Sequence, residues 1–298
     1  MKINKLASVI CRGLWLIEPR TAAGMMPLAA RFLNGEPILE SFAANEPELP
    51  SMYTGGNYIS ADNDDFFQNV QQNSVLVIPI SGTIMKDDWC YEPGTDTLSE
   101  WFRCAMDSPN IAGVVLKVNS GGGSVEGTGE FADLIKAAVK PVVAYTDGIM
   151  ASAAYWIGCS ANEIFASHRT VEIGSIGTAI TFTDNREAME KYGYKQVYIN
   201  AETSPDKNQD YFKALDGDFR AIRVNILNPT NDIFMESVQE NRKGKLKLLT
   251  KIEDGDGKTL NEPLTGKMYL AESAIAIGLI DKIGLLQDAV DRVLELAA

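Results

Sequence analysis

Histidine is almost absent from this chain of 298 residues, which contains only His168. A single imidazole excludes sites built from several histidines, such as the H-E-x-x-H zinc motif. A Ser-His-Asp triad would have to use that one residue. We expect His168 to be a surface or structural residue and any catalytic base to be something other than imidazole.

Cysteine and long apolar runs are also scarce. The four cysteines are widely separated and form no C-x-x-C motif, so the sequence favours a reducing compartment and predicts no disulfide framework. The apolar stretch at residues 6–11 ends at Arg12, well short of the about 18 to 20 residues that span a bilayer. The sequence therefore predicts neither a membrane anchor nor an export signal.

Basic residues are outnumbered, with 27 Lys and Arg against 40 Asp and Glu and a formal net charge of −13. This balance repels phosphate backbones and anionic membrane surfaces, so nucleic acid is not an expected ligand. The hydrophobic fraction of 45% and the chain length are those of a globular protein with a large core.

Two regions differ in composition. We expect residues 1–72 to form short peripheral helices at 14–33 followed by a mobile arm rich in Pro, Asn, Asp, Gly and Ser. Residues 73–298 should form one α/β domain, because apolar β-branched runs alternate with helical segments. Expected strands are 75–80, 111–118, 141–145, 163–167, 177–184 and 195–200. Expected helices are 96–106, 126–139, 150–159, 185–192, a region interrupted at Pro229, 271–277 and 286–296.

Two motifs follow expected strands. The motif Asn119–Ser124, which contains Gly121, Gly122 and Gly123, comes directly after strand 111–118. Glycine there lets the backbone approach a ligand and leaves N–H groups free to face an anion. Ser152 lies among small residues after strand 141–145, at a strand-to-helix turn that could expose its hydroxyl as in a nucleophile elbow, although G-x-S-x-G is absent. Alone, each motif also fits an ordinary turn or helix cap.

The order and spacing of NSGGGSVEG, DGIMASAAYWIGCSANEIFAS, GSIGT and LTGKMYLAESAIAIGLIDKIG resemble the S49 peptidases, the signal peptide peptidase A family, over residues 75–284. The segment GLWLIEPRTAAGMMPLAARF is similar to the N-termini of the phage and prophage branch, whose members act in capsid maturation. The resemblance implies a ClpP/crotonase-like fold, and it implies proteolysis in the cytoplasm of a bacterial host. Possible partners are capsid or scaffold proteins.

The resemblance also implies a serine-lysine dyad with Ser152 as nucleophile. Lys207 and Lys213 are the candidate bases, and Lys207 matches the family's lysine loop better. Ser175 matches a serine that orients the lysine, although a simple turn serine is an equal alternative. An amine must lose its proton to act as a base, which burial at a subunit contact favours.

The tetrahedral oxyanion would be held by the N–H of Gly122 or Gly123 together with that of Ala153. No metal or cofactor is required. The family's ring assemblies imply a homo-oligomer in which neighbouring subunits complete each site. Two alternatives stay open, namely a crotonase-type acyl-CoA enzyme and a catalytically silent assembly or scaffold protein.

Overall fold

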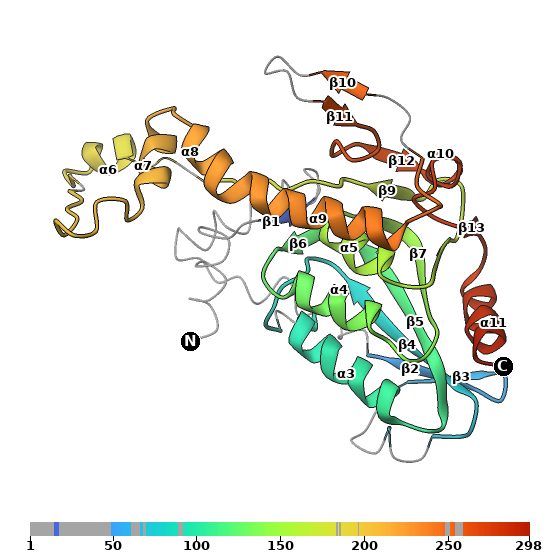
Figure 1. Ribbon diagram of the computed structural model, residues 1–298. Coiled ribbons are helices and arrows are strands. Elements are labelled where there is room, and N and C mark those ends of the chain that lie inside the picture. Colours follow the sequence, from blue (N-terminus) through green and yellow to red (C-terminus); the bar gives the residue numbers. More distant parts are fainter. Residues whose placement is uncertain are drawn as a thin grey trace.

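The central element of the structure, a computed structural model, is a nine-stranded sheet (Figure 1). Seven strands follow the order β12 (Met268–Leu270), β9 (Glu172–Gly174), β7 (Val142–Ala151), β5 (Ile111–Ser120), β4 (Ser74–Ser81), β2 (Ser51–Thr54) and β3 (Asn57–Ser60). In addition, β8 (Glu163–Ala166) pairs with β7, and β13 (Lys282–Ile283) pairs with β8. The structure describes residues 15–17, 49–60, 66–67, 70–88, 92–182, 184, 186–195, 197–247, 251–253 and 259–298. The interior strands pair in parallel: β4 (Ser74–Ser81), β5 (Ile111–Ser120), β7 (Val142–Ala151), β8 (Glu163–Ala166) and β9 (Glu172–Gly174). The predicted α/β class is confirmed.

Helices cover both faces of this sheet, as nearly continuous apolar strands require. One face packs against α3 (Thr95–Asp107), α4 (Thr128–Lys136) and α5 (Ala153–Cys159) through the larger core cluster. The other face packs against α11 (Leu286–Ala297), where Val75, Val115 and Val143 meet Val290 and Val293. Alternate residues of one strand, such as Val75 and Leu76, enter the two different clusters.

The sheet begins earlier in the chain than the sequence suggests. Strands β2 (Ser51–Thr54) and β3 (Asn57–Ser60) form a hairpin, and β2 pairs antiparallel with β4. Residues 51–60 therefore belong to the main sheet and not to a mobile arm, and the expected boundary at residue 73 falls inside the sheet. Residues 15–17 form strand β1 (Trp15–Ile17) where a peripheral helix was expected, and the rest of 14–33 lies outside the described residues.

The described residues form no strand at two expected places. Those of 177–184 contain only an isolated bridge, those of 195–200 are irregular, and the short strand β9 lies next to β7. Pro229 does not interrupt the helical region. It lies in the first turn of α9 (Asn228–Asn241), directly after a π-helical turn, η2 (Arg223–Leu227), where the loss of one backbone donor is tolerated.

A projecting arm, residues 186–227, precedes α9. It contains α6 (Arg186–Lys191), α7 (Gln209–Leu215), α8 (Arg220–Ile222) and η2. Figure 1 shows α6 and α7 extending well beyond the sheet, while α9 runs across the body next to α5. Trp156 of α5 stacks on Phe234 of α9 with ring centroids 4.8 Å apart, which fixes the arm's supporting helix to the core.

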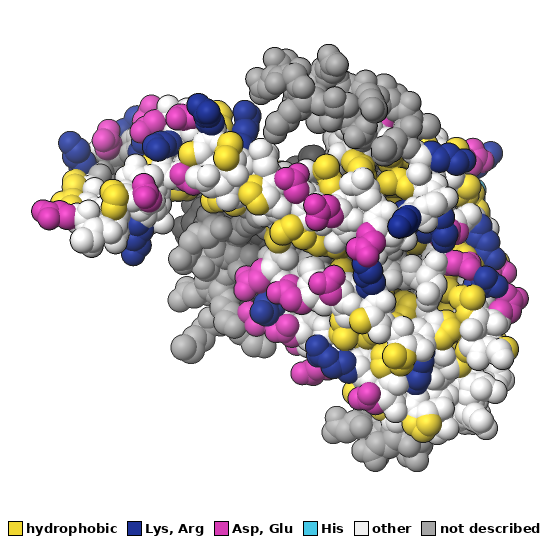
Figure 2. Space-filling model, viewed as in Figure 1, with side chains coloured by type: hydrophobic (Ala, Val, Ile, Leu, Met, Phe, Trp, Pro, Cys, Tyr) yellow, Lys and Arg dark blue, Asp and Glu magenta, His cyan; other side chains and the backbone are white. Residues whose placement is uncertain are grey.

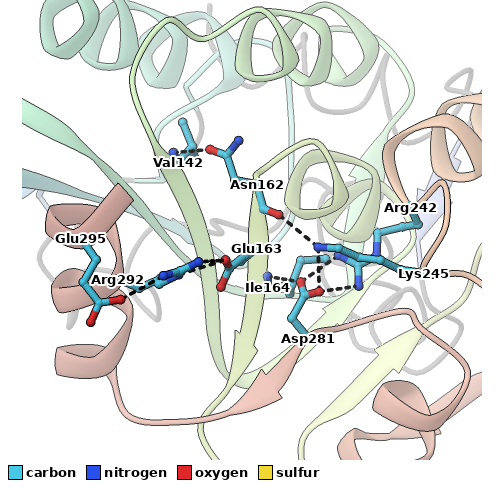
Figure 3. Close-up of polar contacts among 9 residues, drawn as sticks. All are labelled: Val142, Asn162, Glu163, Ile164, Arg242, Lys245, Asp281, Arg292 and Glu295. Atoms are coloured by element: carbon cyan, nitrogen blue, oxygen red, sulfur yellow. Dashed lines mark hydrogen bonds and ion pairs between the residues drawn. The ribbon is translucent and has the colours of Figure 1, made fainter. Parts of the chain in front are cut away.

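The C-terminal end of α9 is held by a buried ion pair (Figure 3). Arg242, of which 1% is exposed, donates to both carboxylate oxygens of Asp281 at 2.8 and 3.1 Å, and Lys245 pairs with the same carboxylate at 2.8 Å. Burial raises the pKa of Asp281, but the hydrogen bonds from Arg242 and Lys245 lower it by more, so it lies below its ordinary value. Nearby, Arg292 of α11 pairs with Glu163 at the start of β8.

The remaining elements complete the C-terminal part. Strand β12 (Met268–Leu270) pairs antiparallel with β9, and β13 (Lys282–Ile283) pairs in parallel with β8. Helix α10 (Ala271–Ala276) lies between them in the sequence, as expected. Strands β10 (Lys251–Glu253) and β11 (Thr259–Asn261) form a separate antiparallel pair. None of the helices among the described residues is long and apolar enough to cross a bilayer.

Candidate active site

Ser152 occupies a sharp turn between β7 and α5. Strand β7 ends at Ala151 and α5 begins at Ala153, so one residue makes the connection. Its backbone has φ 55° and ψ −119°, a conformation that L-residues rarely adopt and that costs about 1 to 3 kcal/mol. The surrounding structure enforces it, because Ser152 N–H donates to Gly174 O at 2.8 Å and Trp156 N–H donates to Ser152 O at 2.9 Å. This is the geometry of a nucleophile elbow.

The hydroxyl of Ser152 has no structural partner. The residue is 1% exposed, and Oγ forms no hydrogen bond within the described part of the chain. A buried hydroxyl without a partner costs about 1 to 3 kcal/mol, so native structures rarely keep one without a functional reason. Its position does not suit it to capping α5 either, since no side-chain cap bond is formed. The turn presents a strained, unpaired hydroxyl.

Ser175 lies beside this turn. Ala151 of β7 is paired with Gly174 of β9, so Ser152 and Ser175 follow directly after partners on adjacent parallel strands. Ser175 also has a positive φ of 52°, is 8% exposed, and donates its N–H to Lys267 O at 3.0 Å. Two strained, buried serines at the same edge of a sheet are an arrangement that neither motif alone could establish.

The glycine loop forms a short strand, β6 (Gly122–Ser124), which contacts α5. The N–H of Gly122 donates to Ser120 Oγ at 3.1 Å, and Ser120 Oγ in turn donates to Gly82 O at 2.6 Å. This role of Ser120 was not predicted, although the serine directly precedes three glycines in the sequence. The N–H of Gly122 is therefore already hydrogen-bonded within the loop.

Gly123 is fixed by a close backbone approach. A Cβ at this position would lie 1.9 Å from Ile84 O, so only glycine fits. On that edge of β6, Ile84 N–H donates to Gly122 O and Ser124 N–H donates to Ile84 O. Because successive residues of a strand direct their N–H and C=O groups to opposite edges, those of Gly123 face the other edge. Ala153 is the first residue of α5, so the helix provides no acceptor for its N–H.

The structure does not bring Lys207 to Ser152 within one chain. Lys207 is exposed and lies between α6 and α7 of the arm, which projects away from α5 (Figure 1). Its carbonyl accepts a hydrogen bond from the Asn200 side chain at 3.2 Å, which helps to fix the loop. Lys213 is also exposed, on α7. Both candidate bases therefore lie on the projecting surface.

Helix α5 contains two other potential nucleophiles, Tyr155 and Cys159, and both are buried. Burial raises the pKa of Cys159 in α5 to about 12, so its thiol stays protonated and unreactive. Burial likewise raises the pKa of Tyr155, whose hydroxyl donates to Leu279 O at 2.8 Å. His168 is exposed and bonds to Thr170 at 2.8 Å. No three metal-binding side chains gather among the described residues.

Just over half of the chain matches a known family profile. Residues 135–298, which include Ser152, Ser175 and Lys207, match the profile described as "Peptidase family S49". The chain belongs to peptidase family S49. This S49 chain is 31% identical to Protease 4 of Salmonella typhi over 228 residues, covering 75% of this chain and 35% of that protein. It is 23% identical to Capsid assembly protease C of Escherichia phage lambda over 225 residues, covering 73% and 48%.

The S49 chain spans between about a third and just over half of the length of the curated relatives it matches. Among solved structures, a ClpP1 mutant from Listeria monocytogenes aligns with a TM-score of 0.42 at 15% identity, covering 72% of this chain and 94% of that one. An enoyl-CoA hydratase/isomerase family member aligns with a TM-score of 0.40 at 17% identity, covering 74% and 70%.

Proposed function

We propose that this chain is a serine endopeptidase in which Ser152 is the nucleophile. The observation that carries the proposal is the Ser152 turn, which holds a buried hydroxyl without a hydrogen-bond partner at φ 55°. Membership of family S49 supplies the reaction class, which is acyl transfer from a peptide to water. A strained backbone at a reactive group is typical of sites that are organised before the substrate binds.

In the proposed mechanism, the neutral amine of Lys207 removes the proton from Ser152 Oγ as that oxygen attacks the peptide carbonyl carbon. The C–N bond then breaks, and the proton passes from Lys207 to the leaving amine, which leaves an acyl-enzyme. Water attacks the ester, gives its proton to Lys207, and releases the acid as Ser152 regains its proton. The N–H groups of Gly123 and Ala153 would stabilise both oxyanions.

Gly123 is a better donor candidate than Gly122, because the N–H of Gly122 already binds Ser120 Oγ at 3.1 Å. Ser175 is proposed to orient the amine of Lys207. Its support is that Ser152 directly follows β7, Ser175 directly follows β9, and the last residues of these two strands are paired.

We further propose that Lys207 acts on Ser152 of a neighbouring subunit in a homo-oligomeric ring. Two features of the arm support this arrangement. Lys207 lies between α6 and α7 on the arm, which extends away from α5 of the same chain (Figure 1), and the arm exposes apolar side chains among the described residues. These include Tyr192, Val197 and Ile199, which are 79%, 70% and 86% exposed, and Figure 2 shows hydrophobic side chains on this projection. Such surfaces typically mark contacts with other chains.

The similarity to Capsid assembly protease C of phage lambda supports a role in phage or prophage head maturation, with capsid or scaffold proteins as substrates in the host cytoplasm. The exposure of Lys207 also favours a second candidate, a catalytically silent assembly protein, if no neighbouring subunit places Ser152 beside it. A crotonase-type acyl-CoA enzyme would not need the Ser152 turn. Covalent labelling of Ser152 discriminates between these functions.

The test is reaction with a fluorophosphonate probe, followed by mass spectrometry of the labelled peptide, together with hydrolysis of labelled casein. We expect one adduct on Ser152, and we expect Ser152→Ala to abolish both adduct and hydrolysis. Ser160→Ala, at the other end of α5, is the matched control and should keep both activities. Casein hydrolysis that survives Ser152→Ala in pure protein would refute the assignment.

A further inference from the structure

Strand β1 pairs with β6, the strand that contains the proposed oxyanion donor Gly123. Residues 15–17 pair antiparallel with β6, with Trp15 opposite Ser124, Leu16 opposite Gly123 and Ile17 opposite Gly122. The sequence separation exceeds one hundred residues, so this contact is not a local hairpin. It is formed by a segment that precedes the main sheet, and it lies on the strand whose glycine N–H is the proposed oxyanion donor.

The two edges of β6 are occupied differently. One edge is closed by the body of the protein through the Ile84 backbone, where Gly123 leaves no room for a Cβ. The remaining edge receives β1. The N–H and C=O of Gly123 face this second edge, opposite Leu16, so β1 lies at the acceptor position of the proposed oxyanion donor.

An extended peptide bound to this edge would pass close to Ser152. Ser120, at the end of β5, pairs with Met150 of β7, two residues before Ser152, and β6 contacts α5 directly after that point. Addition of a peptide strand to a free sheet edge binds the backbone regardless of sequence, while neighbouring pockets select side chains. This edge of β6 could therefore bind the backbone of a peptide substrate beside Ser152. An apolar segment of the same chain, β1, already pairs with it.

We infer that residues 15–17 occupy the peptide-substrate position on the edge of β6, so that the N-terminal segment is an intramolecular competitor of peptide substrates. This inference rests on the proposed function. The substrate class that it implies is an extended, apolar peptide aligned antiparallel to β6. Substrate binds only when β1 leaves the edge.

The expected size of the competition follows from tethering. A covalently attached competitor can reach an effective concentration in the millimolar range, and KM values of enzymes typically lie between about 1 μM and 1 mM. If the effective concentration of β1 is about ten times its dissociation constant for the edge of β6, about a tenth of the sites are open to substrate. The apparent KM is then raised about tenfold, and kcat is unchanged.

A reversible cross-link tests the inference directly. Cβ atoms of directly opposed residues on antiparallel strands lie about 4.5 to 5.5 Å apart, close to the range that a disulfide spans. In the chain of 298 residues, Trp15→Cys combined with Ser124→Cys should form a disulfide on oxidation, detected by mass spectrometry. Oxidation should reduce hydrolysis of fluorescein-labelled casein at least tenfold, and dithiothreitol should restore it. Each single cysteine variant is a matched control and should not respond.

A second variant avoids new cysteines. Leu16→Pro removes the backbone N–H opposite Gly123 and should lower the apparent KM for casein about tenfold with kcat unchanged, whereas Ala43→Pro, elsewhere in the N-terminal region, should change neither. Failure of the double cysteine variant to cross-link would overturn the inference. A complete cross-link with undiminished casein hydrolysis would overturn it too, while leaving the peptidase assignment intact. Absence of any fluorophosphonate adduct on Ser152 in every reduced variant would instead refute the proposed function.

Discussion

Replacing Ser152 with glycine or alanine separates backbone strain from chemistry. Both substitutions remove the hydroxyl, and both therefore remove the cost of an unpaired buried Oγ, about 1 to 3 kcal/mol. Only glycine also removes the Cβ that makes φ 55° and ψ −119° unfavourable. The two variants thus differ in one structural respect, the strain of the turn.

Backbone strain and unfolded-state entropy together set the expected difference in free energy of unfolding between the two variants. Strain of this kind costs about 1 to 3 kcal/mol, and glycine instead of alanine costs about 0.4 to 1 kcal/mol through the entropy of the unfolded chain. We expect Ser152→Gly to exceed Ser152→Ala in free energy of unfolding by about 1 kcal/mol, and both to be at least as stable as the wild-type protein. Neither variant should retain peptidase activity.

The assay is urea denaturation of the three proteins followed by circular dichroism, with the slopes compared to confirm that the transitions are equivalent. Gly129→Ala in α4 calibrates an ordinary helical glycine effect, because a Cβ there would lie 3.7 Å from the Trp156 side chain, in normal van der Waals contact. If Ser152→Gly is less stable than Ser152→Ala by about 0.5 to 1 kcal/mol, the turn is not strained and the reasoning fails.

Three further predictions follow from the structure. Asp281→Asn should lower the free energy of unfolding by about 3 to 5 kcal/mol in urea denaturation at pH 7, because it leaves Arg242 buried without its carboxylate. Since folding lowers the pKa of Asp281, its contribution is present above about pH 4 and is lost as the pH falls further, so the gap between wild type and variant should narrow in acid. Gly123→Ala should abolish casein hydrolysis and destabilise the fold, because its Cβ would lie 1.9 Å from a backbone oxygen. Iodoacetamide at pH 8 should modify exposed Cys104 and spare Cys159, whose pKa is raised to about 12, as peptide mapping will show.

Each of these predictions has a contrary result. An Asp281→Asn variant whose deficit is unchanged at pH 3 would show that the ion pair does not titrate with folding. Wild-type activity in Gly123→Ala would remove β6 from the proposed site. Alkylation of Cys159 as fast as that of Cys104 would show that α5 opens readily to solvent.

The parallel strands and the Ser152 turn could be predicted because their residues carry local signals. Uninterrupted apolar runs such as 75–80 are long enough to be buried on both faces, and a serine among alanines after such a run indicates a turn into a helix. The expected strand at 195–200 was wrong for a physical reason. Val197 and Ile199 have strand-like composition, yet they are 70% and 86% exposed on the arm. Composition does not say whether an apolar run is covered by its own chain.

The position of Lys207 could not be predicted, because it depends on the direction in which α9 carries the arm. That direction is set by distant contacts, such as Trp156 on Phe234 and Arg242 on Asp281. The pairing of residues 15–17 with β6 was equally inaccessible, since the segment carries no local signal beyond a few apolar residues.

The most direct measurement of whether Ser152 is activated by Lys207 of an adjacent subunit is complementation between two inactive variants. Ser152→Ala and Lys207→Ala should each lose casein hydrolysis, the latter by about 10² to 10⁴-fold. In oligomers assembled from equal amounts of both, roughly a quarter of the shared sites combine an intact serine with an intact lysine, so we expect about a quarter of the wild-type activity. Mixed oligomers, verified by native mass spectrometry, that remain as inactive as the separate variants would contradict the account.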